Sequence, residues 1–374
     1  PPYSFIATCA SIHNAGAKPI FVDIKNDYNI DENKIENAIT KKTKAIMPVH
    51  WAGRPCELDK IRTIAKKYNL KIIQDASQAI DSRFKNKHLV SFGDICTYSM
   101  HPLKNLNIWG DGGFIATNNK KIADKLYLLR NHGLISRNKR KIFGYNSRLD
   151  TIQAVVANYK LKNKLTNITK KRIKNALLFD KAFRGNPNVK TVKRFRHLKE
   201  VYHLYHINVK KRDQLQQYLI KNNVDAKVHY PIPIHLQDAA KYLKYKRGDF
   251  PIAEKMANTT ISLPVHEFIK EKEPHIKGFS DKNLWRMKQF FETYQNNQKL
   301  SALLTQLTWT NNLLILSAAK SDEEREFYIN LASKEKYSSR ELDKQIKSGC
   351  YERIMLSNKK LSAVMRQLPQ DTNS

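Results

Sequence analysis

Lys104 stands in a short loop directly after a predicted strand over residues 96–99. Glycines at positions 110, 112 and 113 then form a turn that leads into another predicted strand, residues 114–117. An amine held where parallel strands end is well placed to attack a carbonyl group. Lysine is abundant in this chain and is usually a solvated surface residue, so the case for Lys104 depends on its neighbours.

Further polar and aromatic side chains follow the ends of the predicted strands, at His50, Trp51, Asp75, Gln78 and Ser99. A cofactor with a pyridine ring, an aldehyde and a phosphate needs a lysine for the Schiff base and a carboxylate that keeps the ring nitrogen protonated. Asp75 fits the carboxylate role. The same position equally suits the N-cap of a following helix.

The elements that must position these residues alternate between strand and helix patterns over residues 1–135. Predicted strands lie at residues 19–23, 44–49 and 70–73. One predicted helix follows Asp31, and a second, over 57–67, has an apolar face formed by Leu58, Ile61, Ile64 and Ala65. This alternation predicts an α/β fold with a mainly parallel sheet, in which ligands lie beyond the carboxyl ends of the strands.

Later segments continue with a helical pattern over 151–183, whose apolar stripe includes Ile152, Val155 and Leu165. A strand over 202–209 and a helix over 212–222 then suggest a small α+β domain.

Several short stretches, in order along the chain, carry a family resemblance: 2–8, 43–50, 74–79, 98–105, 110–113, 130–133, 145–150, 229–233 and 263–264. On these stretches, residues 1 to about 269 resemble the fold-type I, pyridoxal-phosphate (PLP)-dependent aminotransferases of the DegT/StrS group, which aminate keto sugars carried on nucleotides. The resemblance implies a PLP-binding large domain over 1–187, incomplete at its N-terminus, and a small α+β domain over 188–269.

The resemblance implies roles for five residues around the cofactor. Lys104 forms the Schiff base and, once freed, moves a proton between the cofactor carbon and the sugar carbon. Asp75 pairs with the pyridinium nitrogen, and Gln78 lies near the ring hydroxyl. Ser99 contacts the phosphate and Phe5 stacks on the ring. Because members of the group with histidine at the lysine position act as dehydratases, Lys104 favours amino transfer.

Other implied roles concern the substrate and a second subunit. Asn146 matches an asparagine that reaches the cofactor phosphate of the neighbouring subunit, which implies a homodimer with shared active sites. His229 and Tyr230 match a loop near the sugar, and His101 is a further substrate candidate. The implied reaction transfers an amino group, with glutamate as donor, to a keto sugar nucleotide for cell-surface polysaccharide or lipopolysaccharide.

Structural explanations remain open at several of these positions. The His-Tyr-Pro turn at 229–231 could serve the fold alone, and Trp51 is at least as consistent with a core position as with a substrate contact. Arg148 and Asp150 could form a local ion pair beside Asn146.

The front of the chain departs from the family pattern. Family members carry, ahead of the position of Pro1, a Gly-Thr-(Ser/Ala) turn and a helix N-terminus that hold the cofactor phosphate. The sequence opens at Pro1 without this segment. This predicts a truncated large domain with weakened cofactor binding.

Composition narrows the function classes. With 41% hydrophobic residues the chain can bury a sizeable core, and it has neither an 18-residue apolar run nor a signal-peptide pattern, which predicts a cytoplasmic protein without membrane contact. The four cysteines form no CxxC motif, so neither a disulfide framework nor a metal site is indicated. The net charge of +33 suggests a polyanion partner, but the basic residues are spread along the whole chain.

After residue 267 the aminotransferase resemblance stops, and 270–277 is predicted to be a charged linker. Residues 278–374 are mostly helical, and stretches at 279–291, 307–313, 322–328 and 338–346 resemble the winged-helix-like N-terminal domain of the YhcG-type PD-(D/E)XK nucleases. The catalytic core of those nucleases would lie further downstream, so we interpret Glu323, Glu324 and Glu326 as a solvated helix face. Trp285, Arg286 and Lys288 could contact nucleic acid or belong to an amphipathic core helix.

Two alternatives to an active aminotransferase follow from this organisation. One is a nucleic-acid-binding module that carries a degenerate aminotransferase fragment. The other is an inactive chimera of two partial genes, a truncated fusion without a coherent activity.

Overall fold

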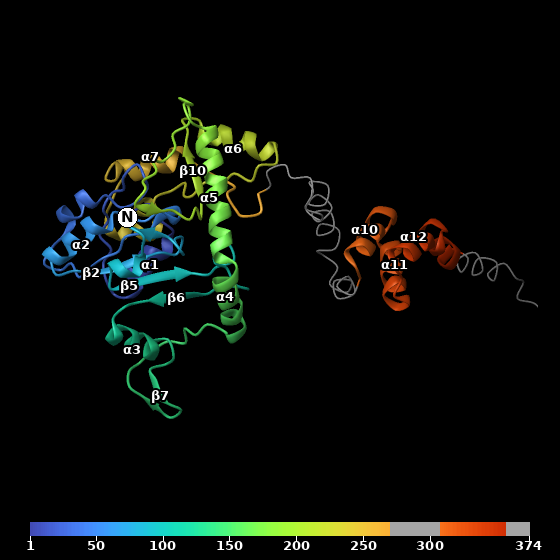
Figure 1. Cartoon of the computed structure of the whole chain (residues 1–374), viewed down its shortest axis with the longest axis horizontal. Helices are drawn as coiled ribbons and strands as arrows, with labels where there is room; N and C mark the ends of the chain where they lie inside the picture. Colours follow the sequence, from blue (N-terminus) through green and yellow to red (C-terminus); the bar gives the residue numbers. More distant parts are fainter. Residues whose placement is uncertain (270–306, 357–374) are drawn as a thin grey trace, which may run out of the picture. The chain divides into compact units, whose positions relative to one another are not determined.

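The computed structural model describes residues 1–269 and 307–356 of the chain. The chain divides into two compact units, Pro1–Ile269 and Lys270–Ser374 (Figure 1). The predicted linker and the stretch that contains Trp285, Arg286 and Lys288 lie outside the described residues, and the domain boundary predicted at residue 187 stays a prediction. Among the described helices, none combines the length and the apolar character that crossing a bilayer requires.

The central sheet of the first unit has four strands in the order β1-β2-β5-β6. These are Ala45–Ile46 (β1), Lys71–Asp75 (β2), Ile95–Ser99 (β5) and Gly113–Ala116 (β6). β2 pairs in parallel with both β1 and β5, whereas β6 returns antiparallel to β5. The sheet is therefore mixed, because a loop rather than a crossover helix joins β5 to β6. This loop carries Lys104, and β2 and β5 end at the same edge of the sheet.

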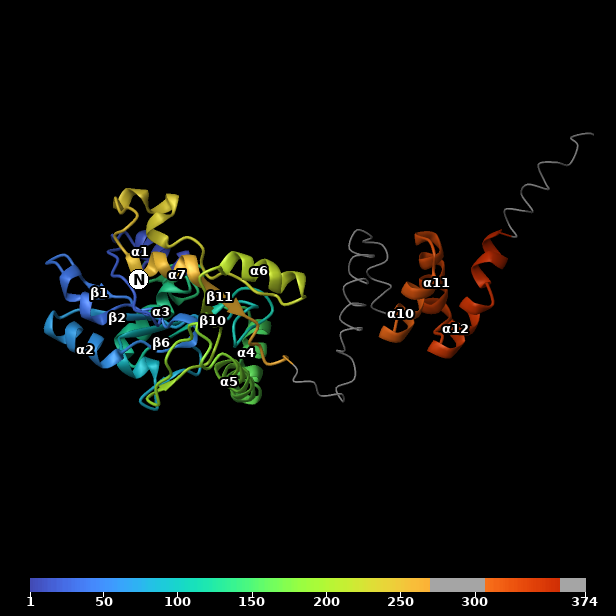
Figure 2. The same ribbon diagram turned by 90° about the horizontal axis from the view of Figure 1, so that it is seen from above.

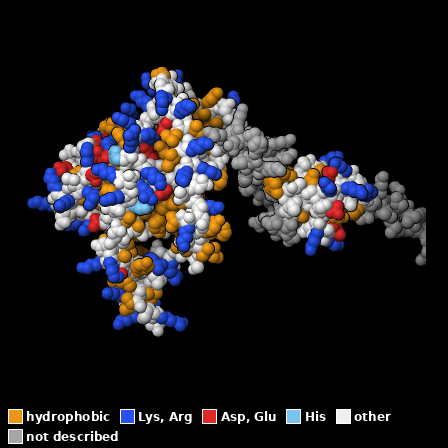
Figure 3. Space-filling view, in the orientation of Figure 1, with side chains coloured by type: hydrophobic (Ala, Val, Ile, Leu, Met, Phe, Trp, Pro, Cys, Tyr) orange, Lys and Arg blue, Asp and Glu red, His pale blue; other side chains and the backbone are white. Residues whose placement is uncertain are grey.

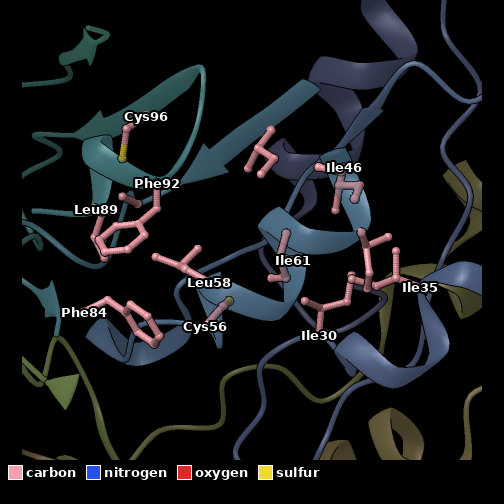
Figure 4. Close-up of a cluster of buried hydrophobic side chains, with 14 of the residues drawn as sticks. Ile30, Ile35, Ile46, Cys56, Leu58, Ile61, Phe84, Leu89, Phe92 and Cys96 are labelled. Carbon is pink, nitrogen blue, oxygen red and sulfur yellow. The ribbon is translucent and has the colours of Figure 1, made fainter. Parts of the chain in front are cut away.

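Helix α2, Leu58–Lys67, packs against this sheet through the apolar face that its spacing predicts. Its buried residues are Leu58, Ile61, Ile64 and Ala65. They share one hydrophobic cluster with Ile46 from β1, Ile72 from β2 and Cys96 from β5 (Figure 4). This cluster fixes the strands whose ends carry the candidate site.

The segment between α1, Ile6–Asn14, and β1 differs from the sequence prediction. The predicted strand over 19–23 forms no ladder, and only an isolated bridge joins Ile24 to Ile30. Asp31 does cap the next segment, since its carboxylate accepts a hydrogen bond from the Asn33 N–H at 3.1 Å. That segment forms two 3₁₀ helices instead of an α-helix, because its hydrogen bonds run from residue i to i+3.

Short helices and strands complete the first unit. The 3₁₀ helices are Glu32–Lys34, Glu36–Ala38, Trp51–Gly53, Leu89–Phe92, Ile234–Leu236 and Asp238–Leu243. A three-stranded sheet in the order β4-β3-β9 consists of Arg83–Phe84 (β3), Lys87–His88 (β4) and Leu198–Lys199 (β9). An arm contains α3, Lys120–Leu129, and the hairpin of β7, Leu134–Ser136, with β8, Lys139–Arg140; it projects below the body in Figure 1.

The predicted helix over 151–183 is two helices, α4 (Thr151–Asn163) and α5 (Leu165–Ala182), which meet at Lys164. They form the upright column in Figure 1. Beyond them, β10 (Tyr205–Asn208) pairs antiparallel with β11 (Thr260–Leu263), accompanied by α6 (Arg212–Lys221) and α7 (Pro251–Thr259) (Figure 2). The strand and helix predicted for the small domain are therefore present, with β10 shorter than predicted.

In the described part of the second unit, residues 307–356, three α-helices pack around Ile315, Tyr328, Ile329 and Leu342. They are α10 (Trp309–Ala318), α11 (Asp322–Glu335) and α12 (Ser339–Lys347), followed by a π-helical turn, Glu352–Leu356. The interpretation of Glu324 as solvated is wrong: it is buried, and its carboxylate accepts a hydrogen bond from the Lys320 N–H at 2.6 Å. A winged helix over 278–374 stays a prediction.

Candidate active site

Lys104 lies in the loop between β5 and β6 and is held through its backbone. Its N–H donates to the His101 carbonyl at 2.8 Å, and its carbonyl accepts from the Asn107 side chain at 3.0 Å. Desolvation lowers the pKa of the Lys104 amine, and the Asp75 carboxylate partly offsets this effect. A lysine pKa lowered by burial increases the fraction of the nucleophilic free amine.

Asp75 is the last residue of β2 and stands near that amine. Its Oδ2 accepts a hydrogen bond from the Thr8 hydroxyl at 2.7 Å, and its Oδ1 accepts one from the Ser77 N–H at 3.0 Å. The chain then makes turns, and no helix starts at this point, so Asp75 is not the N-cap of a following helix. Its carboxylate keeps acceptor capacity for a further donor.

Tyr230 lies near Asp75 and Gln78, and Ser99 is the last residue of β5, the strand before the Lys104 loop. The Gln78 side-chain oxygen accepts from the Ala52 N–H at 2.6 Å, and Ser99 Oγ accepts from the His101 N–H at 3.3 Å. Burial, with a smaller contribution from Asp75, raises the pKa of Tyr230 to about 12, and a hydrogen bond with the Gln78 side chain acts in the opposite direction. Tyr230 is therefore near both residues and keeps its proton at neutral pH.

Phe5 and the loop at 229–230 meet at the N-terminal segment. Phe5 directly precedes α1, is 56% exposed, and has its ring centroid 6.1 Å from that of Tyr230. The Tyr3 hydroxyl donates to the His229 carbonyl at 2.5 Å and accepts from the Tyr230 N–H at 2.8 Å. His229 Nδ1 lies 3.0 Å from Ser262 Oγ. These contacts place the loop beside α1, which also contacts Asp75.

His101 and Trp51, which both follow strand ends, differ in how far they are exposed. The His101 side chain is 46% exposed, and its Nδ1 accepts from the Leu103 N–H at 3.1 Å. Trp51 is 1% exposed and stacks on Tyr28 with ring centroids 4.4 Å apart, so it belongs to the core.

His50 is also internal. Its Nε2 lies 2.9 Å from the Gln74 side-chain oxygen, and its Nδ1 accepts from the Cys56 N–H at 3.0 Å.

Asn146 is not brought to the other candidates within this chain. It is exposed on the arm, where it forms a bridge with Asn131. Arg148 Nε donates to the Asn146 side-chain oxygen at 3.1 Å, and Asp150 instead caps α4 by accepting from the Ile152 N–H at 3.0 Å.

Sequence reasoning missed two residues of this site. Thr8 lies in a stretch that carried the family resemblance, but its contact with Asp75 spans 67 positions and has no local signal. His203 has a buried Nδ1 without a hydrogen-bond partner in the described part of the chain, and Lys104 is the strongest charge acting on it. No motif marked it.

Comparison with known proteins identifies the family to which the chain belongs. Residues 1–276 match the DegT/DnrJ/EryC1/StrS aminotransferase family. The chain belongs to this family. Residues 259–353 match the DUF1016 N-terminal domain. The resemblance of the first unit stated from its motifs is thus confirmed. For the second unit the match gives the DUF1016 N-terminal domain, and the resemblance to nucleases stays a prediction.

Similar proteins include two relatives and one solved structure. The pleiotropic regulatory protein of Geobacillus stearothermophilus is 40% identical over 274 residues, covering 72% of this chain and 73% of the relative. The dTDP-3-amino-3,6-dideoxy-alpha-D-galactopyranose transaminase of Aneurinibacillus thermoaerophilus is 38% identical, covering 73% and 74%. The structure of DesV from S. venezuelae in complex with a ketimine intermediate is 31% identical, with a TM-score of 0.71 and coverages of 72% and 73%.

The aminotransferase has the fold of the fold-type I PLP enzymes and is a PLP-dependent transaminase. The residues present fit this cofactor. The Lys104 amine has neither a hydrogen-bond nor an ion-pair partner among the described residues, and the neighbouring Asp75 carboxylate has acceptor capacity to spare. Phe5, the N-cap residue of α1, is an exposed ring whose centroid lies 6.1 Å from that of Tyr230.

Proposed function

We propose that the protein transfers an amino group, with glutamate as donor, to the keto group of a sugar carried on a nucleotide. The observation that carries this proposal is the electrostatic interaction between the Lys104 amine, in the loop after β5, and the carboxylate of Asp75, the last residue of the neighbouring strand β2. Several relatives support the substrate class, since they are named as transaminases of dTDP- or UDP-linked sugars.

Bound PLP supplies an electron sink for the bond changes at the amino carbon. We propose that Asp75 holds the proton of the ring nitrogen, oriented for this by the Thr8 hydroxyl. Lys104 Nζ attaches the cofactor and, when free, takes up and returns a proton at the reacting carbon. The buried position of Lys104 supports this role because desolvation favours the uncharged amine.

Further residues are proposed to hold the cofactor and the sugar. Ser99, at the end of β5, supplies a hydroxyl for the phosphate, Gln78 faces the ring hydroxyl, and Phe5 packs on the ring. For the substrate we propose the loop of His229 and Tyr230 together with His101. The interaction of the Tyr230 side chain with Asp75 and Gln78 supports the assignment of Tyr230.

Charge supports an anionic substrate. Residues 1–269 contain 49 Lys and Arg against 21 Asp and Glu, and basic side chains are spread over the visible face of the first unit (Figure 3). Such an excess of positive charge attracts a nucleoside diphosphate group and speeds its encounter with the enzyme. We propose a role in the cytoplasm, where nucleotide-linked sugars are made for surface polysaccharide or lipopolysaccharide.

We propose that two copies form a homodimer with shared active sites. Three apolar side chains of α4 are largely exposed: Ile152 at 64%, Val155 at 62% and Tyr159 at 55%. Hydrophobic side chains gather near α4 in Figure 3. Leu103, next to the catalytic lysine, is 73% exposed. A second copy would cover these residues and bring its Asn146 to the cofactor phosphate.

The net charge of the chain gives little support to the alternative of a nucleic-acid-binding module. Within residues 307–356, eight Lys and Arg accompany eight Asp and Glu, so the described part of the second unit has no net charge. Of the net charge of +33, +28 (49 minus 21) belongs to residues 1–269, the aminotransferase part.

The test is an assay of purified full-length protein with PLP, glutamate and UDP- or dTDP-linked keto sugars. We expect a nucleotide-linked amino sugar and an equal amount of 2-oxoglutarate, both measured by mass spectrometry. Lys104→Ala should abolish both products, whereas Lys125→Ala, at an exposed site on α3, should leave them unchanged. Absence of both products from the wild-type protein with every keto sugar would contradict the proposal.

A further inference from the structure

The loop that contains Tyr230 is tied to the N-terminal segment through one buried hydroxyl group. The Tyr3 hydroxyl donates a hydrogen bond to the His229 carbonyl at 2.5 Å and accepts one from the Tyr230 N–H at 2.8 Å. Both polar atoms of the peptide unit between His229 and Tyr230 therefore bond to the same side chain. Because Tyr3 and His229 lie 226 positions apart, no local sequence pattern indicates this contact.

Tyr3 is a firm anchor for this peptide unit. Its side chain is fully buried, and its ring centroid lies 5.7 Å from the rings of both Tyr28 and Trp51. Burial raises the pKa of the Tyr3 phenol, so the hydroxyl keeps its proton. Since a carbonyl can only accept, this proton points to His229, and the hydroxyl oxygen is left to accept from the Tyr230 N–H.

The segment that contains Tyr3 also contacts the carboxylate of the site. Five positions after Tyr3, the Thr8 hydroxyl donates to Asp75 Oδ2 at 2.7 Å, and the Thr8 N–H donates to the Phe5 carbonyl at 3.2 Å. The Phe5 ring centroid lies 6.1 Å from that of Tyr230. Residues 3–8 therefore contact both Asp75 and the loop, so the position of the loop relative to Asp75 depends on Tyr3.

We propose that Tyr3 is a positioning residue for the sugar nucleotide: its hydroxyl fixes the peptide unit before Tyr230 and so sets where the Tyr230 side chain meets the substrate. This role rests on the proposed function, which assigns Tyr230 to the sugar. Without the hydroxyl, the Tyr230 N–H and the His229 carbonyl lose this partner. The loop then occupies its binding position for only part of the time, which weakens the apparent affinity for the sugar nucleotide.

Amide hydrogen exchange tests the anchoring without a substrate. Deuterium uptake is measured by mass spectrometry of a peptide over residues 229–234, in which Pro231 and Pro233 carry no N–H. Tyr3→Phe keeps the ring and removes the hydroxyl, so exchange at the Tyr230 N–H should become about tenfold faster. Unchanged exchange at Tyr230 in this variant would overturn the proposal.

Tyr28→Phe is the matched control. Tyr28 is as fully buried as Tyr3, but its hydroxyl donates to the Asn208 side chain at 2.9 Å and lies 2.6 Å from the Thr260 hydroxyl. Thr260 also interacts with the Tyr3 hydroxyl, so the difference between the two variants isolates the bonds to the loop. Tyr28→Phe should leave exchange at Tyr230 unchanged, and equal acceleration in both variants would overturn the proposal. Both replacements keep the ring that fills the core, and thermal unfolding confirms that both proteins are folded.

Steady-state kinetics of the full-length protein test the consequence for the substrate. Tyr3→Phe should raise the KM for the keto sugar nucleotide about tenfold, while kcat and the KM for glutamate stay within about twofold of wild type. Because Tyr3 acts through Tyr230, adding Tyr3→Phe to Tyr230→Ala should cause no further loss.

Two kinetic results would refute the role of Tyr3. One is an unchanged KM for the sugar nucleotide in Tyr3→Phe, and the other is an additive loss in the double variant. Wild-type protein that shows the predicted exchange rates but aminates no sugar would contradict the proposed function, and Tyr3 would remain the anchor of the loop.

Discussion

The Asp75 carboxylate receives its orientation from a helix that precedes it by more than sixty residues. The Thr8 hydroxyl on α1 binds Oδ2, and the Ser77 N–H binds Oδ1. Hydrogen bonds to an ionised group are stronger than those between neutral groups. Thr8 therefore sets the direction in which Asp75 presents its remaining acceptor positions to the cofactor.

Replacement of Thr8 tests this function. Thr8→Val keeps the side-chain shape but removes the donor, and we expect kcat/KM to fall roughly tenfold. Thr8→Ser keeps the hydroxyl and should retain most of the activity. Steady-state kinetics with glutamate and a keto sugar nucleotide measure the effect, and a valine variant as active as wild type would show that Asp75 needs no such support.

His50 makes stability depend on pH. Burial lowers its pKa to about 4, and hydrogen bonding to Gln74 only partly opposes this. Above pH 6.5 the histidine is neutral in both folded and unfolded chains. Below that value the unfolded chain binds the proton first, so the contribution of His50 to stability declines by about 3 kcal/mol as the pH falls towards 4.

Urea unfolding between pH 8 and 4.5 measures this loss. His50→Gln should lose less stability over the interval than wild type, because glutamine does not titrate. Parallel losses in the two proteins would show that other groups account for the acid sensitivity.

At the residue scale, the sequence predicts the lysine and the carboxylate as site residues because each stands at or after the end of a recognisable strand. It could not locate Thr8, since this residue acts through a contact between segments far apart in the chain. Trp51 also follows a strand end, but its position was decided by the Tyr28 ring, which no local pattern reveals.

Among the elements, α2 was predicted correctly in extent and in buried face because its apolar residues repeat with the helical period. The stripe on α4 has the same kind of periodicity, yet Ile152 and Val155 are exposed within the chain. Periodicity shows that a helix has an apolar face and does not show which molecule covers it. The strand predicted at 19–23 shows a related limit of sequence patterns. A short apolar run resembles a strand, but it does not show whether another strand lies beside it to form a ladder.

Ile61 tests the contribution of α2 to the core. The residue is fully buried between the helix and the sheet (Figure 4). Ile61→Ala should lower the free energy of unfolding by about 3 kcal/mol, since it removes buried methyl groups and leaves a cavity. Lys66→Ala, on the exposed face of the same helix, should change it by less than about 0.5 kcal/mol. Urea unfolding gives both values, and similar losses would refute this account of the core.

For the whole molecule, the exposed apolar residues of α4 predict the assembly state. Val155→Glu places a charge in the proposed interface and should convert the dimer to a monomer with greatly reduced activity. Leu177→Glu, at a 55% exposed site on α5, should leave the dimer intact. Sedimentation velocity measures both. A wild-type monomer with full activity would contradict the shared active site.

The central claim is that the Lys104 amine joins the cofactor beside Asp75. The direct measurement is borohydride reduction of the protein after addition of PLP, followed by peptide mass spectrometry. We expect a stable pyridoxyl adduct on the peptide that contains Lys104, and none at that position in Lys104→Ala. An adduct spread over surface lysines, with Lys104 unmodified, would contradict the account.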